Sequence, residues 1–322
     1  MVILLITNGM SLRERFGDVL SNLGDENEQI VVLDADLSAS TMTCKFGKKF
    51  PDRFFNAGIA EQNMMGMAMG LASTGKIPIV SGFTCFTVGR AWEFIKAAAY
   101  DDLAVKICTT HSGLSSGKDG GTHQSLEDLS LIASIPNTRI YCPCDPSEIQ
   151  PMLEKMIAEP GVGYLRLMRN SLPLLWKAEH VFSDDFIETI QQSSENITDI
   201  TIFSTGSMSA FMPEVISILQ EQGLTIHAMH VGRIKPLLPN CIEQCIGKTR
   251  LIVTVEEHNV INGFGAQLSR LACEKMPARI ITIGIDDKFG QSGSQDELYE
   301  AYGLKPCQIA NKISDSFNGL QV

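Results

Sequence analysis

Short, nearly continuous apolar runs recur along the chain, separated by stretches in which apolar positions repeat with a helical period. The runs predict strands at residues 30–33, 77–80, 105–108, 139–141, 163–167, 200–203, 225–229, 250–255 and 279–283. Strands that are apolar on both faces are typical of parallel sheets covered by helices on both sides. The intervening patterns predict helices at residues 12–23, 60–73, 90–100, 146–159, 209–222 and 266–274.

This alternation of strand and helix predicts an α/β fold with two doubly wound domains, each a mainly parallel sheet with helices on both faces. The polar stretch 176–198 interrupts the alternation, which restarts at Asp199. We therefore expect a first domain at residues 1–178, a partly helical linker at 179–198 and a second domain at 199–322. The length of 322 residues agrees with two domains of about 150 residues each.

Charge, hydropathy and cysteine content indicate which partners and which cellular location to expect. The 37 acidic and 26 basic side chains give a net charge of −11, which repels phosphate backbones, so we expect no nucleic acid partner. No run reaches the ~20 apolar residues of a membrane span, and residues 1–6 are too short for a signal peptide, so we expect no membrane partner. Nine cysteines, mostly in apolar runs, favour free thiols and a cytoplasmic location.

Possible metal ligands do not form a recognisable pattern. Cys142 and Cys144 are separated by a single proline, which is not the spacing of structural zinc sites. His227 and His230 are three residues apart in a predicted strand, so their side chains point to opposite faces. We expect no metal site formed by ligands of this chain alone.

The segment 54–63, Phe-Phe-Asn-Ala-Gly-Ile-Ala-Glu-Gln-Asn, leads into a helix rich in glycine and alanine. We expect Asn56 to cap this helix and Glu61 to lie about one turn inside it. Because interior glycines weaken a helix, their presence suggests that another backbone or a ligand approaches closely. A partly desolvated Glu61 can hold or share a proton; the alternative is a surface carboxylate favoured by the helix dipole.

Two other segments follow predicted strands, at the edge where open α/β sheets bind ligands. Residues 111–124 contain two histidines, an aspartate, a lysine and four glycines, which suits either a ligand-binding loop or an ordinary surface loop. Phe83 and Phe86 can form one wall of a flat pocket for a ring, or pack in the core. Residues 263–265, Gly-Phe-Gly, lack the third glycine of a dinucleotide fingerprint, so we interpret them as helix–strand packing.

Together these segments resemble the C-terminal half of transketolase and its relatives over nearly the full length of the chain. The matching segments are Asn-Ala-Gly-Ile-Ala-Glu-Gln-Asn at 56–63, the Phe83/Phe86 segment, His111, Asp-Gly-Gly-Thr-His-Gln at 119–124, and residues 165–170, 256–258 and 286–293. The resemblance implies a pyrimidine-binding domain followed by a transketolase C-terminal domain. It also implies thiamine diphosphate and Mg²⁺ as cofactors.

On the cofactor side, the resemblance implies that Glu61 hydrogen-bonds the aminopyrimidine ring. This contact favours the imino tautomer, which removes the proton from the thiazolium carbon. Phe83 and Phe86 match the aromatic wall around the pyrimidine, and Gly89 replaces the third aromatic residue of that wall. Asp36 matches a residue close to the cofactor.

On the substrate side, the resemblance implies that His111 and His123 bind sugar hydroxyls and assist proton transfers. It implies that Asp119 binds the hydroxyl next to the carbonyl. Three positions match residues that bind a terminal phosphate: Arg13, Ser40 and Arg169. A guanidinium suits that task, and a surface ion pair is the alternative for each arginine. Lys118 and Gly121 depart from the residues common in the family, which leaves the choice of acceptor open.

The Gly-Asp-Gly motif with which the family holds magnesium and the diphosphate is absent from the sequence. Its Gly-Asp pairs, at 17–18 and 24–25, do not continue to a second glycine. The resemblance therefore implies a split enzyme in which an N-terminal subunit supplies the diphosphate-binding domain and holds most of the cofactor and the metal. We expect the glycine-rich helix at 58–72 to form part of the contact, and two copies of each chain to form an α2β2 heterotetramer.

The implied function is transfer of a two-carbon ketol unit from a ketose phosphate to an aldose, a transferase reaction of carbohydrate and pentose phosphate metabolism. One alternative is another thiamine diphosphate enzyme, such as a deoxyxylulose-phosphate synthase or the β subunit of a 2-oxoacid dehydrogenase. Another is a non-catalytic partner subunit. Glu61, His111 and His123 argue against a scaffold, which has no use for them, and Asp119 with the arginines favours a sugar phosphate.

Overall fold

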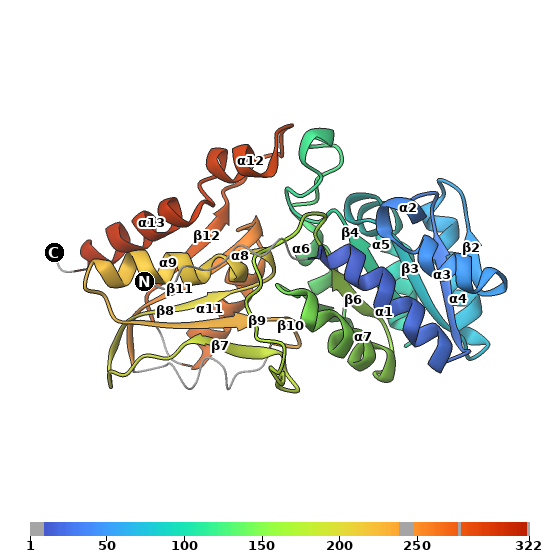
Figure 1. Cartoon of the computed structure of the whole chain (residues 1–322), viewed down its shortest axis with the longest axis horizontal. Coiled ribbons are helices and arrows are strands. Elements are labelled where there is room, and N and C mark those ends of the chain that lie inside the picture. The colour runs from blue at the N-terminus through green and yellow to red at the C-terminus, as the bar shows by residue number, and fades with distance from the viewer. Residues whose placement is uncertain (1–9, 238–247, 276–277, 321–322) are drawn as a thin grey trace.

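The structure is a computed structural model that describes residues 10–237, 248–275 and 278–320. Within these ranges the chain forms a seven-stranded and a five-stranded sheet, which lie side by side (Figure 1). Each sheet is mainly parallel and has helices on both faces, so the predicted fold class is confirmed. Among the described helices, none is both long enough and apolar enough to cross a bilayer.

The first sheet has the strand order β10-β5-β6-β4-β3-β1-β2, and all its pairs are parallel except β5 with β10. Its strands are β1 (Ile30–Asp34), β2 (Phe54–Asn56), β3 (Ile77–Phe83), β4 (Lys106–Thr110), β5 (Arg139–Tyr141), β6 (Gly163–Arg166) and β10 (Arg233–Lys235). β1 is buried along its whole length, as expected for a strand between two layers of helices.

The described helices on this sheet are α1 (Leu12–Glu26), α2 (Ser38–Thr41), α3 (Cys44–Lys49), α4 (Glu61–Ser73), α5 (Thr84–Tyr100), α6 (Asp128–Ala133) and α7 (Ile149–Ala158). α1 begins at a capping box in which Ser11 Oγ accepts from the Glu14 amide at 3.4 Å and the Glu14 carboxylate accepts from the Ser11 amide at 3.1 Å. Its buried apolar side chains recur every three or four residues, so one face packs on the sheet.

The second sheet has the order β12-β11-β8-β9-β7, with only β7 antiparallel. Its strands are β7 (Ile187–Gln191), β8 (Thr198–Ser204), β9 (Ile226–Val231), β11 (Thr249–Asn259) and β12 (Ile280–Ile285). Its helices are α8 (Ser207–Ala210), α9 (Met212–Glu221), α11 (Phe264–Lys275), α12 (Gln295–Ala301) and α13 (Pro306–Asn318). One apolar core lies between this sheet and α9, α12 and α13, whereas the side of the sheet that α11 covers joins the core of the first sheet.

Several local predictions are wrong. The segment 179–198 contains no helix; it contributes β7, which pairs with β9 at the edge of the second sheet. The chain also returns to the first sheet, since β10 pairs with β5. Asn56 ends β2 and does not cap α4, because Gly58 turns the chain with a φ of 70° and the helix begins at Glu61. Asn56 Oδ1 instead accepts from the Gly58 amide at 2.9 Å.

Candidate functional site

The predicted site residues gather at one edge of the first sheet. Because β1, β2, β3, β4 and β6 are parallel, their carboxyl ends meet at the same edge. Most candidates lie at or just after these ends: Asp36 after β1, Glu61 after β2, Phe83 at the end of β3, His111 after β4 and Arg169 after β6. The topology thus brings together residues that are more than 100 positions apart.

Glu61 is the first residue of α4, and only 5% of its surface is exposed. It lines an open pocket of about 510 Å³ together with Ile59, Asn63 and Arg90. Arg90, on α5, donates from Nη1 to both carboxylate oxygens of Glu61, at 2.9 and 3.1 Å. The guanidinium carbon of Arg90 also lies 4.4 Å from the centroid of the Phe86 ring.

Arg90 was not among the residues that the sequence singled out. The spacing of Phe86 and Arg90 could have pointed to it. Residues four apart lie on the same face of a helix, so Arg90 would be expected beside Phe86. The predicted helix began at Arg90 and so excluded Phe86; the observed helix begins at Thr84 and contains both.

The two phenylalanines contact both loop histidines. The rings of Phe83 and Phe86 lie 6.1 Å apart at an angle of 16°. Phe83 stacks on His111 with centroids 3.8 Å apart, and Phe86 meets the edge of the His123 ring at 5.2 Å. Phe83 is buried and Phe86 is partly exposed, so together they form a wall between the core and the loop.

His111 is almost fully buried and has a positive φ of 62°. Its Nδ1 lies 2.8 Å from Thr110 Oγ1. Burial, followed by the positive charges of Arg13 and Arg169, lowers the pKa of His111 to about 3. The imidazole is therefore neutral at neutral pH, and its Nε2 can take part in one further hydrogen bond.

The two candidate anion-binding arginines lie close to His111. Arg13 Nη1 donates to the Ser40 carbonyl at 2.9 Å, while its buried Nε has no hydrogen-bond partner among the described residues. Arg169 Nη1 lies 3.9 Å from the Asp119 carboxylate. Burial and, next, the positive charge of Arg169 lower the pKa of Arg13. Ser40 contributes its backbone carbonyl rather than its hydroxyl.

Asp36 is held by hydrogen bonds to Asn56. It is exposed and has a positive φ of 63°. Its amide donates to Asn56 Oδ1 at 3.2 Å, and its carboxylate accepts from Asn56 Nδ2 at 3.3 Å. Within the described part of the chain it hydrogen-bonds to no other candidate residue, so its connection to the site is only its position at the same sheet edge.

The second sheet holds the loop at 111–124 in position. Glu257, on β11, accepts from the Leu114 amide at 2.8 Å and from the Tyr299 hydroxyl at 2.7 Å. Gly113 must be glycine here, since its φ is 61° and a Cβ would lie 2.5 Å from the Glu257 carboxylate. Gln124 Nε2 donates to the Gln291 carbonyl at 3.0 Å. Sequence patterning alone gave no sign of these contacts.

Glu256, next to Glu257, faces the opposite side of β11 and caps α11. Its fully buried carboxylate accepts from the amides of Phe264 and Gly265 at 2.7 and 2.8 Å. A Cβ on Gly265 would lie 2.1 Å from Thr282, which confirms that residues 263–265 serve helix–strand packing. Burial raises the pKa of Glu256 to about 7, although both amides act in the opposite direction.

The raised pKa of Glu256 should make the stability of the folded chain depend on pH. The folded chain keeps the Glu256 proton up to about pH 7, whereas the unfolded chain loses it near pH 4.3. The unfolding free energy therefore falls as the pH rises between these values, by an amount on the order of 3 kcal/mol. We expect the change between pH 5 and pH 8 to be smaller in Glu256→Gln. Equal pH slopes of the two proteins in urea unfolding would contradict this assignment.

One buried group of possible metal ligands exists among the described residues: Cys144, Glu148 and His230. His230 Nε2 lies 2.9 Å from Glu148 Oε1. Glu148 Oε2 accepts from the Cys144 amide at 2.6 Å, so this carboxylate already caps the turn that precedes α7. We assign the group to packing between this turn and β9. His227 points to the other face of β9 and is partly exposed.

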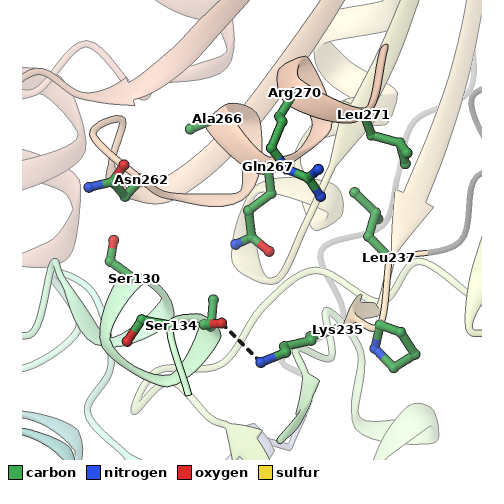
Figure 2. Close-up of a pocket in the computed structure, with 11 residues that line it drawn as sticks. Ser130, Ser134, Lys235, Leu237, Asn262, Ala266, Gln267, Arg270 and Leu271 are labelled. Carbon is green, nitrogen blue, oxygen red and sulfur yellow. Dashed lines mark hydrogen bonds between the residues drawn. The ribbon is translucent and has the colours of Figure 1, made fainter. Parts of the chain in front are cut away.

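Another pocket, of about 620 Å³, lies between α6, β10 and α11 and holds none of the candidate residues (Figure 2). Its Lys235 ammonium donates to the Ala133 carbonyl at 2.9 Å and to Thr138 Oγ1 at 3.0 Å. Arg270 pairs with Glu274 on the same helix. Because both cations already have partners, this pocket offers little chemistry.

The transketolase pyrimidine-binding domain matches residues 8–173, and the transketolase C-terminal domain matches residues 190–309. A protein of Methanocaldococcus jannaschii named as a transketolase C-terminal section is 39% identical over 311 residues, which are 94% of this chain and 95% of that protein. A 6-deoxy-6-sulfo-D-fructose transketolase subunit of Clostridium sp. is 31% identical over 311 residues, 95% of each chain.

Among solved structures, a split-gene transketolase described as an inactive β4 tetramer superposes with a TM-score of 0.87 and 36% identity. The match covers 96% of this chain and 99% of that chain. The chain therefore belongs to the transketolase family and carries its pyrimidine-binding and C-terminal domains.

Proposed function

We propose that this chain is one subunit of a thiamine diphosphate-dependent transketolase that transfers a two-carbon ketol unit from a ketose phosphate to an aldose. The observation that carries the proposal is the buried Glu61 carboxylate, which faces an open pocket beside the Phe86 ring. A carboxylate that lines a pocket and an aromatic ring near it suit a flat, nitrogen-containing ring. The family supplies the identity of that ring.

The residues present fit only one end of the cofactor. Glu61 would accept a hydrogen bond from the pyrimidine ring nitrogen, with Phe83 and Phe86 as its wall. When bound, thiamine diphosphate supplies a carbon nucleophile for the ketose carbonyl and stabilises the charge left when the adjacent C–C bond breaks. The sequence has no Gly-Asp-Gly motif for the diphosphate and Mg²⁺. We therefore propose that a partner subunit holds both.

The surface around the pocket supports such a partner. Ile59, close to Glu61 in the chain, is 77% exposed. Gly66 and Gly70 on α4 are exposed, and a Cβ at either position would have nothing within 4 Å. These glycines are therefore not explained by packing within this chain, and they leave room for another backbone. We propose that this face of α4 binds the N-terminal subunit in an α2β2 assembly.

We assign the loop residues to the sugar. Neutral His111 and the more exposed His123 would bind hydroxyls and move protons, and Asp119 would accept from the hydroxyl next to the carbonyl. Arg13 and Arg169 would bind the terminal anion of the donor. Their positive charges lie together on a chain whose net charge is −11, so the anion has a local site.

If Arg169 binds the phosphate of the donor, its removal should weaken the binding of phosphorylated ketoses only. Arg169→Ala should raise KM for a phosphorylated ketose about tenfold to hundredfold, the size of one or two lost charge-assisted hydrogen bonds. KM for the same ketose without its phosphate should change little. Arg250→Ala, an exposed arginine of the second sheet, is the control. An equal loss with both donors would contradict an anion-binding role.

Location and domain limits complete the proposal. We propose a cytoplasmic location, which the free thiols of Cys108, Cys142 and Cys144 support. We also propose domains at residues 1–178 and 199–322, joined by 179–198.

The decisive experiment is reconstitution with a candidate N-terminal subunit, thiamine diphosphate and Mg²⁺. Turnover of ketose phosphates with aldose acceptors, absent from either subunit alone, is the expected result. Turnover of pyruvate only would assign the chain to the decarboxylating relatives. An assembled, cofactor-bound complex with neither activity would favour a non-catalytic role.

A further inference from the structure

Arg90 occupies both positions at which the proposed function needs contacts with the pyrimidine ring. Its Nη1 donates to the two oxygens of Glu61 at 2.9 and 3.1 Å. Its guanidinium lies over the Phe86 ring, with its carbon 4.4 Å from the centroid. The same carboxylate and the same aromatic ring would bind the cofactor.

The guanidinium is chemically similar to the ring that it would exclude. It is planar and delocalised, it donates N–H groups to a carboxylate, and it stacks on aromatic faces. Arg90 also neutralises the charge of Glu61, whose side chain is only 5% exposed. Among the described residues, Glu61 forms no other ion pair. A buried carboxylate without a counter-charge would be costly, so the arginine stabilises the chain as long as no cofactor is bound.

The arginine is also free to move. Half of its side-chain surface is exposed, whereas its partner Glu61 is buried. The neighbouring Gly89 is exposed, and a Cβ there would have nothing within 4 Å, so the helix surface next to Arg90 is open. Its backbone stays anchored, since the Arg90 carbonyl accepts from Gln62 Nε2 at 3.1 Å. Movement of the half-exposed side chain, with the backbone in place, would release the Glu61 carboxylate.

We propose that Arg90 is an internal substitute for the aminopyrimidine: it occupies the Glu61 carboxylate and the Phe86 ring before assembly and leaves both when thiamine diphosphate binds. This inference rests on the proposed function. It makes Arg90 a residue that sets cofactor affinity, because each binding event must first break the Arg90–Glu61 pair and the contact with Phe86. It also assigns a task to the only cation that lines the pocket among the described residues.

The test is the dissociation constant of thiamine diphosphate for the reconstituted complex at saturating Mg²⁺, measured by calorimetry. The Arg90→Ala complex should bind thiamine diphosphate about three- to thirtyfold more tightly than the wild type. This factor corresponds to the loss of one half-exposed ion pair and one cation–π contact. Arg90→Lys, which keeps the charge without the planar fork, should lie between Arg90→Ala and the wild type. Lys96→Ala, an exposed lysine on the same helix, should leave the constant unchanged.

Unchanged or weaker binding by Arg90→Ala would overturn the inference. If that variant does not assemble, Arg90→Gln gives the same comparison with a side chain of similar length. A wild-type complex that binds no thiamine diphosphate would instead refute the proposed function, so the two failures are distinguishable. A structure of the cofactor-bound complex gives an independent check: Arg90 must no longer contact both oxygens of Glu61.

Discussion

Replacing Glu61 by glutamine in the reconstituted enzyme should reduce kcat by about 10²- to 10⁴-fold, the range for loss of a positioned proton-transfer group. An amide can still hydrogen-bond a ring nitrogen, but it cannot hold and release a proton. Folding should be retained, because the side chain that loses its partner, Arg90, is half exposed and can turn to water. Steady-state rates with a ketose phosphate donor and an aldose acceptor measure the effect.

Glu221→Gln is the matched control, since Glu221 is an exposed glutamate at the end of α9 on the second sheet. We expect it to turn over at the wild-type rate. Size-exclusion chromatography should show that both variants assemble with the partner subunit. An assembled Glu61→Gln complex that keeps the wild-type rate would remove the catalytic role of this residue and favour a scaffold.

The largest effect on stability is expected for Asp128, the fully buried first residue of α6. Its carboxylate accepts from Arg166 Nε at 2.7 Å, from Arg166 Nη2 at 3.2 Å and from the Tyr164 hydroxyl at 2.8 Å. Arg166 also donates to the Glu257 carbonyl at 3.1 Å, which links β6 to β11. Asp128→Ala leaves this guanidinium buried without a counter-charge and should cost about 3–5 kcal/mol.

Urea unfolding of Asp128→Ala, compared with Asp184→Ala, tests this expectation. Asp184 has an almost fully exposed carboxylate, so its removal should change the unfolding free energy by no more than about 0.5 kcal/mol. The double variant Asp128→Leu/Arg166→Met, which replaces the pair by apolar side chains, should recover part of the loss. Similar midpoints for the two alanine variants would contradict a stabilising role of the pair.

The same pair gives a pH dependence of opposite sign to that of Glu256. Burial by itself would raise the pKa of Asp128, but Arg166, His258 and the hydrogen bonds outweigh it and lower the pKa below its usual value. The stabilisation is therefore complete above about pH 4 and is lost only as the pH falls further. Between pH 5 and pH 8 it adds no slope, so the measurement on Glu256 is not affected by it.

Most of the regular elements were predictable because their signals are local. All the predicted strands are present, since strands buried on both faces must be continuously apolar. The missed strands β2, β7 and β10 are edge strands of three to five residues. Edge strands are only partly buried, so their sequences need not be continuously apolar. Whether they form depends on pairing with the neighbouring strand, which a local pattern does not show.

The sequence by itself determined the α/β class, the candidate residues at strand ends and the absence of a Gly-Asp-Gly motif. These follow from periodicity and from motifs of adjacent residues. Only the tertiary structure decided which side chains meet: Glu61 pairs with Arg90, Phe83 stacks on His111, and Asp36, among the described residues, hydrogen-bonds to Asn56 and to no other candidate. It also decided that Glu257 supports a loop 143 residues away. Contacts of this range depend on strand order and burial, which no local pattern specifies.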